Sequence, residues 1–227
     1  MMTIRRLSNV GVVCVVGISA FLLLSISVPR VVANTILFPE KTRLAMSLPS
    51  EEDAYKVLDA LDRAISWSEE PRYFYLKERT MGRLARRQTP SARNENYEVR
   101  VNLLEDGLTR GGLRPYEFVR LANLRTLAGW EASAGMRALN LSVETGQYVR
   151  VLAMPRFKTL YRLWDKLDAT SQQEALPIVQ TAYRVVGRRG MVDYSRDKPM
   201  ARVMIRKALR DNPRELLAFV QATLKRR

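Results

Sequence analysis

The sequence predicts an all-α fold in which an N-terminal transmembrane helix precedes a series of antiparallel helical hairpins. A stretch without charged residues runs from Leu7 to Pro29, and most later segments carry apolar residues three and four positions apart, which is the period of a helix. No run of alternating polar and apolar residues competes with this pattern. Hydrophobic residues make up 47% of the 227 residues and charged residues 27%, so the composition is globular rather than disordered.

The uncharged N-terminal stretch, residues 7–29, is long enough to cross a bilayer, because it exceeds the roughly 20 helical residues that span the hydrocarbon core. Val31-Val32-Ala33 forms a small-residue cleavage site, so a cleaved signal peptide stays open as an alternative. We favour a retained anchor, because the apolar region of a signal peptide is shorter. Arg5 and Arg6 favour a cytoplasmic N-terminus. We therefore expect a single-pass membrane protein with its C-terminal domain outside the cytoplasm.

The chain is expected to divide into three regions. Residues 1–33 form the membrane anchor or uncleaved signal, residues 34–49 a linker, and residues 50–227 one helical domain. We expect residues 1–33 to contribute nothing to the soluble fold.

The expected helices of the domain are bounded by capping residues, glycines and prolines. Ser50 with Asp53 can cap the first helix. The helices that follow cover about residues 72–87, 92–111, 115–129 and 131–144, then segments after Pro155 and Ser171, and finally about 198–210 and 213–224. Ser171 with Glu174 resembles a capping box, Pro177 must kink or restart the next helix, and Gly187 and Gly190 bracket a break.

Aromatic and aliphatic residues form one stripe after Pro155, which we interpret as helix core rather than as a ligand platform. Its members are Phe157, Leu160, Tyr161, Trp164 and Leu167.

Several kinds of chemistry are excluded or disfavoured by composition. The chain has no histidine, which removes Ser-His-Asp and Cys-His nucleophiles and imidazole-ligated metals, and its single cysteine, Cys14, lies in the apolar stretch. We expect no enzymatic activity, no cofactor and no metal. The acidic pairs Glu51-Glu52, Glu69-Glu70 and Glu105-Asp106 leave a carboxylate-based glycan-cleaving enzyme as one alternative, although adjacent residues point to different sides of a helix.

The formal net charge of +15 favours an anionic partner. Because the domain is expected outside the cytoplasm, an acidic glycan or anionic lipid is a better candidate than nucleic acid. Two basic rows lie at helical spacing and are the candidate anion or partner contacts. The first row is Arg79, Arg83 and Arg86 or Arg87, and the second row is Arg202, Arg206 and Arg210, opposite Met200, Val203 and Met204. Both rows are also compatible with an ordinary solvated face.

Residues from Phe118 onward resemble a tetratricopeptide unit. Phe118, Leu121, Ala122, Gly129 and Ala134 occupy its large, Leu, small, Gly and Ala positions, whereas Arg125 and Leu141 depart from the pattern.

The wider segment from Pro115 to Asp168 also resembles a second group of proteins. It contains Leu-Ala-Asn-Leu-Arg-Thr-Leu-Ala-Gly at 121–129, Ala-Leu-Asn-Leu-Ser at 138–142 and Leu-Trp-Asp-Lys-Leu-Asp at 163–168. In these it is similar to membrane-anchored helical bacterial proteins encoded near polysaccharide polymerase or ligase genes. The resemblance implies a context of surface-polysaccharide assembly. It also implies that the single membrane span lies in a bacterial inner membrane, with the C-terminal domain in the periplasm.

Three functional hypotheses follow from the sequence. The leading one is a non-enzymatic, membrane-tethered helical scaffold that binds an envelope or membrane protein, built as a short degenerate tetratricopeptide-like solenoid. The second is direct binding of an anionic glycan or lipid through the arginine rows. The third is the carboxylate-based enzyme.

Overall fold

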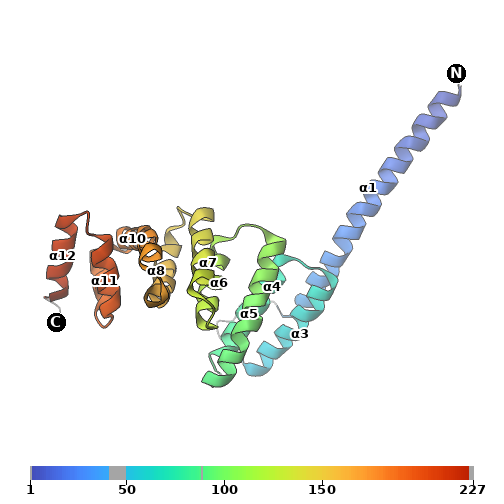
Figure 1. Cartoon of the computed structure of the whole chain (residues 1–227). Coiled ribbons are helices and arrows are strands. Elements are labelled where there is room, and N and C mark those ends of the chain that lie inside the picture. The colour runs from blue at the N-terminus through green and yellow to red at the C-terminus, as the bar shows by residue number, and fades with distance from the viewer. Residues whose placement is uncertain (1, 41–49, 88, 225–227) are drawn as a thin grey trace. The chain divides into compact units, whose positions relative to one another are not determined.

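The computed structural model describes residues 2–40, 50–87 and 89–224, with side chains from residue 15 onward except at 90–95. The described residues are almost entirely helical and include no strand, which confirms the predicted all-α fold (Figure 1). The chain divides into two compact units. Unit 1 contains Met1–Thr89 and Thr109–Gly111, and unit 2 contains Pro90–Leu108 and Gly112–Arg227. The expected single domain of residues 50–227 is therefore divided between the two units.

Unit 1 is built from the N-terminal helix α1 (Met2–Leu37), the hairpin of α3 (Glu51–Trp67) and α4 (Pro71–Ala85), and the last turn of α5 (Pro90–Gly111). Helix α1 does not end at residue 33, where the linker was expected to begin, and its last turn belongs to the core of the unit. The rest of the expected linker, residues 41–49, lies outside the described residues.

The end of α1 packs into the apolar core of unit 1. Ala33 is 0% exposed and Leu37 is buried, and both belong to the cluster formed with α3 and α4. The remaining members of this cluster are Val57, Ala60, Leu61, Ala64 and Tyr73. The expectation that residues 1–33 contribute nothing to the soluble fold is wrong at Ala33, because burial against α3 extends the helix into the packed unit.

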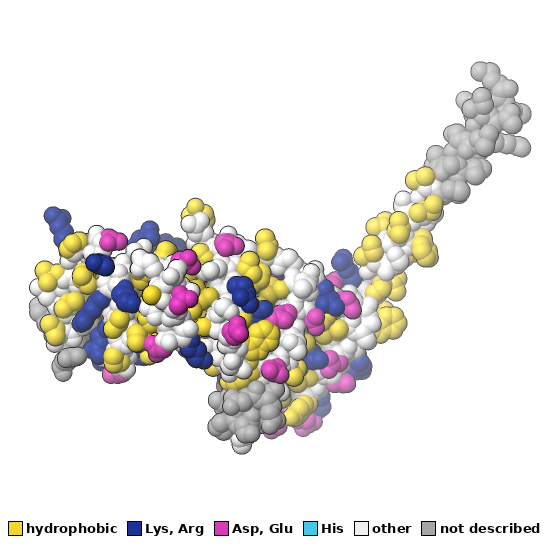
Figure 2. Space-filling model, viewed as in Figure 1, with side chains coloured by type: hydrophobic (Ala, Val, Ile, Leu, Met, Phe, Trp, Pro, Cys, Tyr) yellow, Lys and Arg dark blue, Asp and Glu magenta, His cyan; other side chains and the backbone are white. Residues whose placement is uncertain are grey.

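Among the described side chains, those of residues 15–28 of α1 have no such partner. Apolar side chains from Val15 to Val28 are exposed, and Figure 2 shows those on one face of the helix. Pro29 lies inside the helix rather than at its end. By length and composition, Val15–Leu37 can cross a membrane, so the predicted transmembrane helix is supported by the structure.

The hairpin of unit 1 begins at the expected cap. The Ser50 hydroxyl accepts a hydrogen bond of 3.0 Å from the Asp53 amide, which satisfies a donor in the first turn of α3. Helix α4 then starts at Pro71, where the missing amide proton of proline costs nothing.

Unit 2 is a succession of helices joined by short turns. After the first part of α5 come α6 (Pro115–Leu127), α7 (Ala132–Thr145), α8 (Ala153–Leu163), α9 (Ala169–Glu174), α10 (Leu176–Ser195), α11 (Pro199–Ala208) and α12 (Pro213–Leu224). Short 3₁₀ turns at Arg150–Leu152 and Trp164–Lys166 flank α8. Helices α6 and α7 pack together as a hairpin, and α10 packs against α8, α11 and α12. Gly129 has a φ of +80° at the α6–α7 turn, a conformation that glycine adopts without strain.

The predicted aromatic stripe is core. Phe157 and Leu160 are fully buried, and Trp164 is 1% exposed although it lies in a 3₁₀ turn rather than in α8 itself. Tyr161 is half-buried, and its ring meets that of Tyr194 edge to face with 6.3 Å between the ring centroids. The interpretation as helix core is therefore confirmed.

Helix boundaries after residue 167 differ from the prediction at one cap. Asp168, not Ser171, caps α9, because the Asp168 carboxylate accepts a 2.7 Å hydrogen bond from the Ser171 amide. That hydrogen bond is the first cause of the lowered pKa of Asp168. Pro177 lies in the first turn of α10, so a new helix starts there, as one of the two predicted outcomes required. The break expected between Gly187 and Gly190 lies at Gly187, which has φ 79° and ψ 162° inside α10.

Candidate functional site

The described part of unit 2 carries two adjacent clefts at its C-terminal end. The first cleft has a volume of about 370 Å³ and lies between α9, α10 and the end of α11, with Gln172, Gln180, Lys207, Arg210 and Asp211 among its lining residues. The second cleft has a volume of about 560 Å³ and lies between α10, α11 and α12. Residues of the second cleft include Tyr183, Arg184, Gly187, Arg188, Asn212 and Glu215, and it shares Gln180 and Asp211 with the first. The two clefts therefore adjoin along these shared residues.

Amide groups hold the wall between the clefts in place. The Gln180 side-chain amide donates a hydrogen bond of 3.0 Å to the carbonyl of Ala208, which ties α10 to the end of α11. In the first cleft, the Lys207 ammonium donates a bond of 2.9 Å to the Gln172 side-chain oxygen. Gln172 is in turn fixed by donating to the carbonyl of Trp164 at 3.0 Å. These bonds position the amides while the outer faces of Lys207 and Arg210 remain at the surface.

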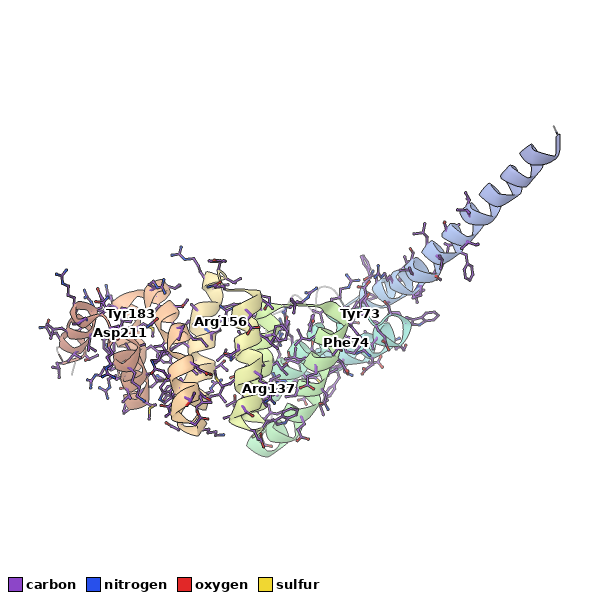
Figure 3. All side chains as sticks on the ribbon, turned by 45° about the horizontal axis from the view of Figure 1, so that its top comes forward. Tyr73, Phe74, Arg137, Arg156, Tyr183 and Asp211 are labelled. Carbon is purple, nitrogen blue, oxygen red and sulfur yellow. The ribbon has the colours of Figure 1, made fainter. Side chains whose placement is uncertain are left out.

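A tyrosine–carboxylate pair organises the second cleft. The Tyr183 hydroxyl donates a hydrogen bond of 3.0 Å to Oε2 of Glu215, and Arg188 lies 3.9 Å from the same oxygen (Figure 3 labels Tyr183 and Asp211). Burial, assisted by the hydrogen bond to Glu215, raises the pKa of Tyr183 to about 12. The tyrosine is therefore a hydrogen-bond donor at neutral pH and not a base.

The break in α10 shapes the same cleft. The φ and ψ angles of Gly187 lie in a region that only glycine populates without strain. Any other residue at this position would have strained backbone angles, although no neighbouring atom would clash with its Cβ. The sequence thus encodes a bend in the wall of the second cleft at one residue.

Buried charges elsewhere in unit 2 are structural. Arg156 is 3% exposed and donates to the hydroxyl of Ser142 at 3.0 Å, to the carbonyl of Ser142 and to the carbonyl of Gly146 at 2.9 Å. Burial lowers the pKa of Arg156, and burial likewise lowers that of Arg120, to about 10. The Arg120 guanidinium pairs with Glu117 at 2.9 Å. Both arginines keep their protons at neutral pH and serve packing.

The arginine rows predicted from the sequence fare differently. Of the second row, Arg210 lines the first cleft and lies beyond the last residue of α11, whereas Arg202 and Arg206 are on α11 outside both clefts. The expected apolar face of that helix was partly wrong, because Val203 is 41% exposed and the core positions are Ala201, Met204, Ile205 and Ala208.

The first row lies in unit 1. Arg79 is exposed and Arg83 is half-buried on α4, and Arg86 and Arg87 are exposed just after it. All four engage in interactions within the chain, so they are not a bare cationic face.

The acidic pairs singled out in the sequence are engaged in ion pairs. Glu69 contacts Arg110 at 3.0 Å, Glu52 contacts Lys56 at 2.5 Å, and Glu105 contacts Arg125 at 2.7 Å. None of them lines either cleft described above. Among the described residues, no group of three or more His, Cys, Asp or Glu side chains could hold a metal ion.

The sequence prediction missed the residues that build the second cleft. Tyr183 and Glu215 are 32 positions apart and on different helices, and no local pattern joins them. The signals that were present were the glycine break at Gly187 and the Asn212-Pro213 start of α12. No protein-family model and no curated protein matches the chain.

Proposed function

We propose that this protein is a membrane-anchored helical adaptor that binds a segment of an envelope or membrane protein in the two clefts of unit 2. One observation carries the proposal. Helix α1 exposes its apolar side chains from Val15 to Val28 and buries Ala33 and Leu37 in the core of unit 1. An apolar helix surface of that kind is stable in lipid and not in water.

The burial of Ala33 favours a retained anchor over a cleaved signal peptide. Cleavage after Ala33 would cut the helix inside its packed region and separate Arg30 from Glu70, which it contacts at 3.0 Å. A signal peptide is discarded, so its residues have no reason to complete the core of the mature protein. We place the start of the chain in the cytoplasm and both units in the periplasm of a bacterial cell, following Arg5 and Arg6.

The anchor is tested by the mass of the protein extracted from membranes. We expect a chain that retains residues 1–33 and resists extraction by alkaline carbonate. Fusions of a periplasm-dependent phosphatase to the C-terminus should be active. A mature protein that begins at Asn34 would overturn the anchor.

The clefts suit an extended segment of a partner protein. Side-chain amides such as Gln173 can pair with the backbone of an extended chain, and the cations on the rims can pair with its acidic side chains. Cations outnumber carboxylates among the lining residues of the two clefts. The cations are Arg184, Arg188, Lys207 and Arg210, and the carboxylates are Asp211 and Glu215. We therefore propose an acidic segment, in the context of envelope polysaccharide assembly that the sequence resemblance implies.

Site-specific crosslinking in cells tests the clefts. A photoreactive residue at Arg184 or Arg188, both lining the second cleft, should give one discrete adduct. The matched control is Arg137, an exposed arginine on α7 outside both clefts (Figure 3). Equal adducts from Arg137, or none from the clefts, would overturn the proposal.

A second candidate is an acidic glycan in the same clefts, favoured by the same excess of cations. The two ligands differ in how they respond to treatment. Digestion of an adduct at Arg184 releases peptides of a second protein if the ligand is a protein. Non-covalent binding of an acidic glycan should instead weaken steeply as ionic strength rises. The carboxylate enzyme has less support, because Glu215 is held by Tyr183 and Arg188 in an ion-pair network.

A further inference from the structure

We propose that the turn between α3 and α4 is a membrane-contacting surface, in which the indole of Trp67 lies in the headgroup region of the bilayer. The proposal goes beyond the adaptor function but rests on its retained membrane helix. It concerns unit 1 alone, and it follows from the directions of three helices and from the side chains at one end of their hairpin.

Two contacts fix the direction of α4 beside α1. Arg30 pairs with Glu70 at 3.0 Å, and four residues further along α1 the Asn34 side-chain oxygen accepts a 3.2 Å hydrogen bond from the Tyr73 hydroxyl. Contacts therefore advance along both helices together, so α4 runs away from the membrane-spanning part of α1. Arg72 strengthens this junction by pairing with Glu70 at 2.6 Å and donating to Asn34.

Helix α3 runs in the opposite direction. Lys77, two turns into α4, contacts Asp62 near the end of α3, as expected for an antiparallel hairpin. The α3–α4 turn is therefore the end of the hairpin closest to the membrane, and the start of α3 is the far end. The last turn of α5 contacts the same end of the hairpin, because Arg110 pairs with Glu69 at 3.0 Å and lies 4.9 Å from the ring centroid of Phe74.

The position of Arg30 sets the level of the turn. Arg30 is the first charged residue after the uncharged stretch that ends at Pro29. One helical residue adds a rise of about 1.5 Å, so Arg30 lies at the edge of the hydrocarbon core when residues 7–29 fill it. Because Glu70 touches Arg30, the α3–α4 turn lies at that edge as well. Charged side chains at this level are solvated by lipid headgroups and water.

Trp67 has the mixed polar and apolar character that suits the headgroup region of a bilayer. It is the last residue of α3 and is 54% exposed, although exposing the large apolar surface of tryptophan to water is unfavourable. Tryptophan favours the membrane interface, where its ring meets apolar matter and its N–H meets water. Arg30 and Arg72 lie at the same end of the hairpin with about half of each side chain exposed, which leaves guanidinium donors for lipid phosphates.

The experiment compares two tryptophan positions on one helix. Trp67→Phe removes the indole at the near end, and the double variant Trp67→Phe with Tyr55→Trp places one at the far end, where Tyr55 is 52% exposed. Trp130 and Trp164 are common to all three proteins. Each full-length protein is reconstituted into phosphatidylcholine–phosphatidylglycerol vesicles, with and without bromine on the acyl chains near the headgroup.

We expect brominated lipid to quench most of the fluorescence that wild type has and Trp67→Phe lacks. The fluorescence that the Tyr55→Trp substitution adds in the double variant should be unaffected by bromine. Circular dichroism should show equal helix content in the three proteins, because both substituted positions are exposed.

The outcomes separate this inference from the adaptor proposal. A chain that floats with the vesicles while the Trp67 component is not quenched would overturn the inference and leave the anchor intact. Equal quenching at the two positions would also overturn it. A chain that does not float with the vesicles would overturn both the anchor and the membrane-contacting turn.

Discussion

The Tyr183 hydroxyl and the Glu215 carboxylate, on α10 and α12, are joined by a hydrogen bond of 3.0 Å. The Tyr183 ring also meets the Phe219 ring edge to face, with 6.2 Å between the ring centroids. One side chain therefore ties α12 to α10 by both a polar and an aromatic contact. The pair closes one side of the second cleft, and its removal should loosen the C-terminal helix.

Tyr183→Phe tests the polar half of this tie. The ring contact survives and the hydrogen bond is lost, so we expect a loss of about 1 kcal/mol in unfolding free energy. The full chain in detergent micelles can be followed by denaturant unfolding. Tyr148→Phe, at an exposed tyrosine, is the control and should change nothing measurable. An unchanged stability in Tyr183→Phe would mean that the bond is replaced by water at no cost.

The raised pKa of Tyr183 predicts a pH dependence. The folded state keeps the phenol proton up to about pH 12, whereas the unfolded chain loses it near pH 10. Between these values the folded state binds more protons, so its stability falls as pH rises. The slope should be smaller in Tyr183→Phe than in wild type when melting temperature is measured from pH 9 to 12. Identical slopes in the two proteins would contradict the assignment.

Gly187→Ala should destabilise unit 2. Its backbone angles are strained for any residue with a Cβ, and we expect a cost of about 1 to 3 kcal/mol or a straightened α10. Arg189→Ala, two residues further and exposed, is the control. Melting temperature reports the cost. Crosslinking from Arg184 reports the shape of the cleft, and the adduct should weaken if α10 straightens.

Arg156→Met removes a buried cation that serves three acceptors. The carbonyls of Ser142 and Gly146 lose a donor inside the protein, so we expect a loss of about 3 kcal/mol or more. Arg150→Met, at an exposed arginine, should have little effect. Thermal unfolding followed by circular dichroism compares them. Similar melting temperatures for both variants would show that water replaces the guanidinium.

Ala33→Leu should overfill the core of unit 1. Ala33 is 0% exposed within the apolar cluster that α1 forms with α3 and α4, so overpacking should cost about 1 to 3 kcal/mol. Val31→Leu, at an exposed position on the same helix, is the control. A neutral Ala33→Leu would indicate that α1 does not pack on α3 at this position.

Most helices could be predicted from local signals, because proline and glycine act on their own backbone. Pro115, Pro177 and Pro213 each begin a helix, and Gly129 ends one. The cap at Asp168 was missed because Ser171 and Glu174 imitate a capping box three residues later.

The end of α1 was missed for a different reason. Asn34 and Thr35 are polar and follow a cleavage site, so the local sequence favours an end to the helix there. Packing of Ala33 and Leu37 on α3 overrides that preference, and the Thr35 hydroxyl bonds back to the carbonyl of Val31 at 2.8 Å.

The candidate site was less accessible from the sequence. Arg210 was identified by spacing, but Tyr183, Gln180 and Glu215 acquire their roles only when α10, α11 and α12 meet. Helical spacing reports one helix at a time, so it places Arg202, Arg206 and Arg210 in one row and cannot tell that only the last of them reaches a cleft.

Helix α1 continues without a loop from its exposed apolar segment into the core that it forms with α3 and α4. The direction in which α3 and α4 face around α1 is therefore set by the helical rotation between the two parts. Each added residue turns an α-helix by about 100° and lengthens it by about 1.5 Å. One residue inserted between Pro29 and Ala33 would rotate α3 and α4 more than a quarter turn around the axis of α1, whereas seven would return them to within about 20° of their original direction. The side of unit 1 that a neighbour in the membrane meets is therefore set by the number of residues in α1.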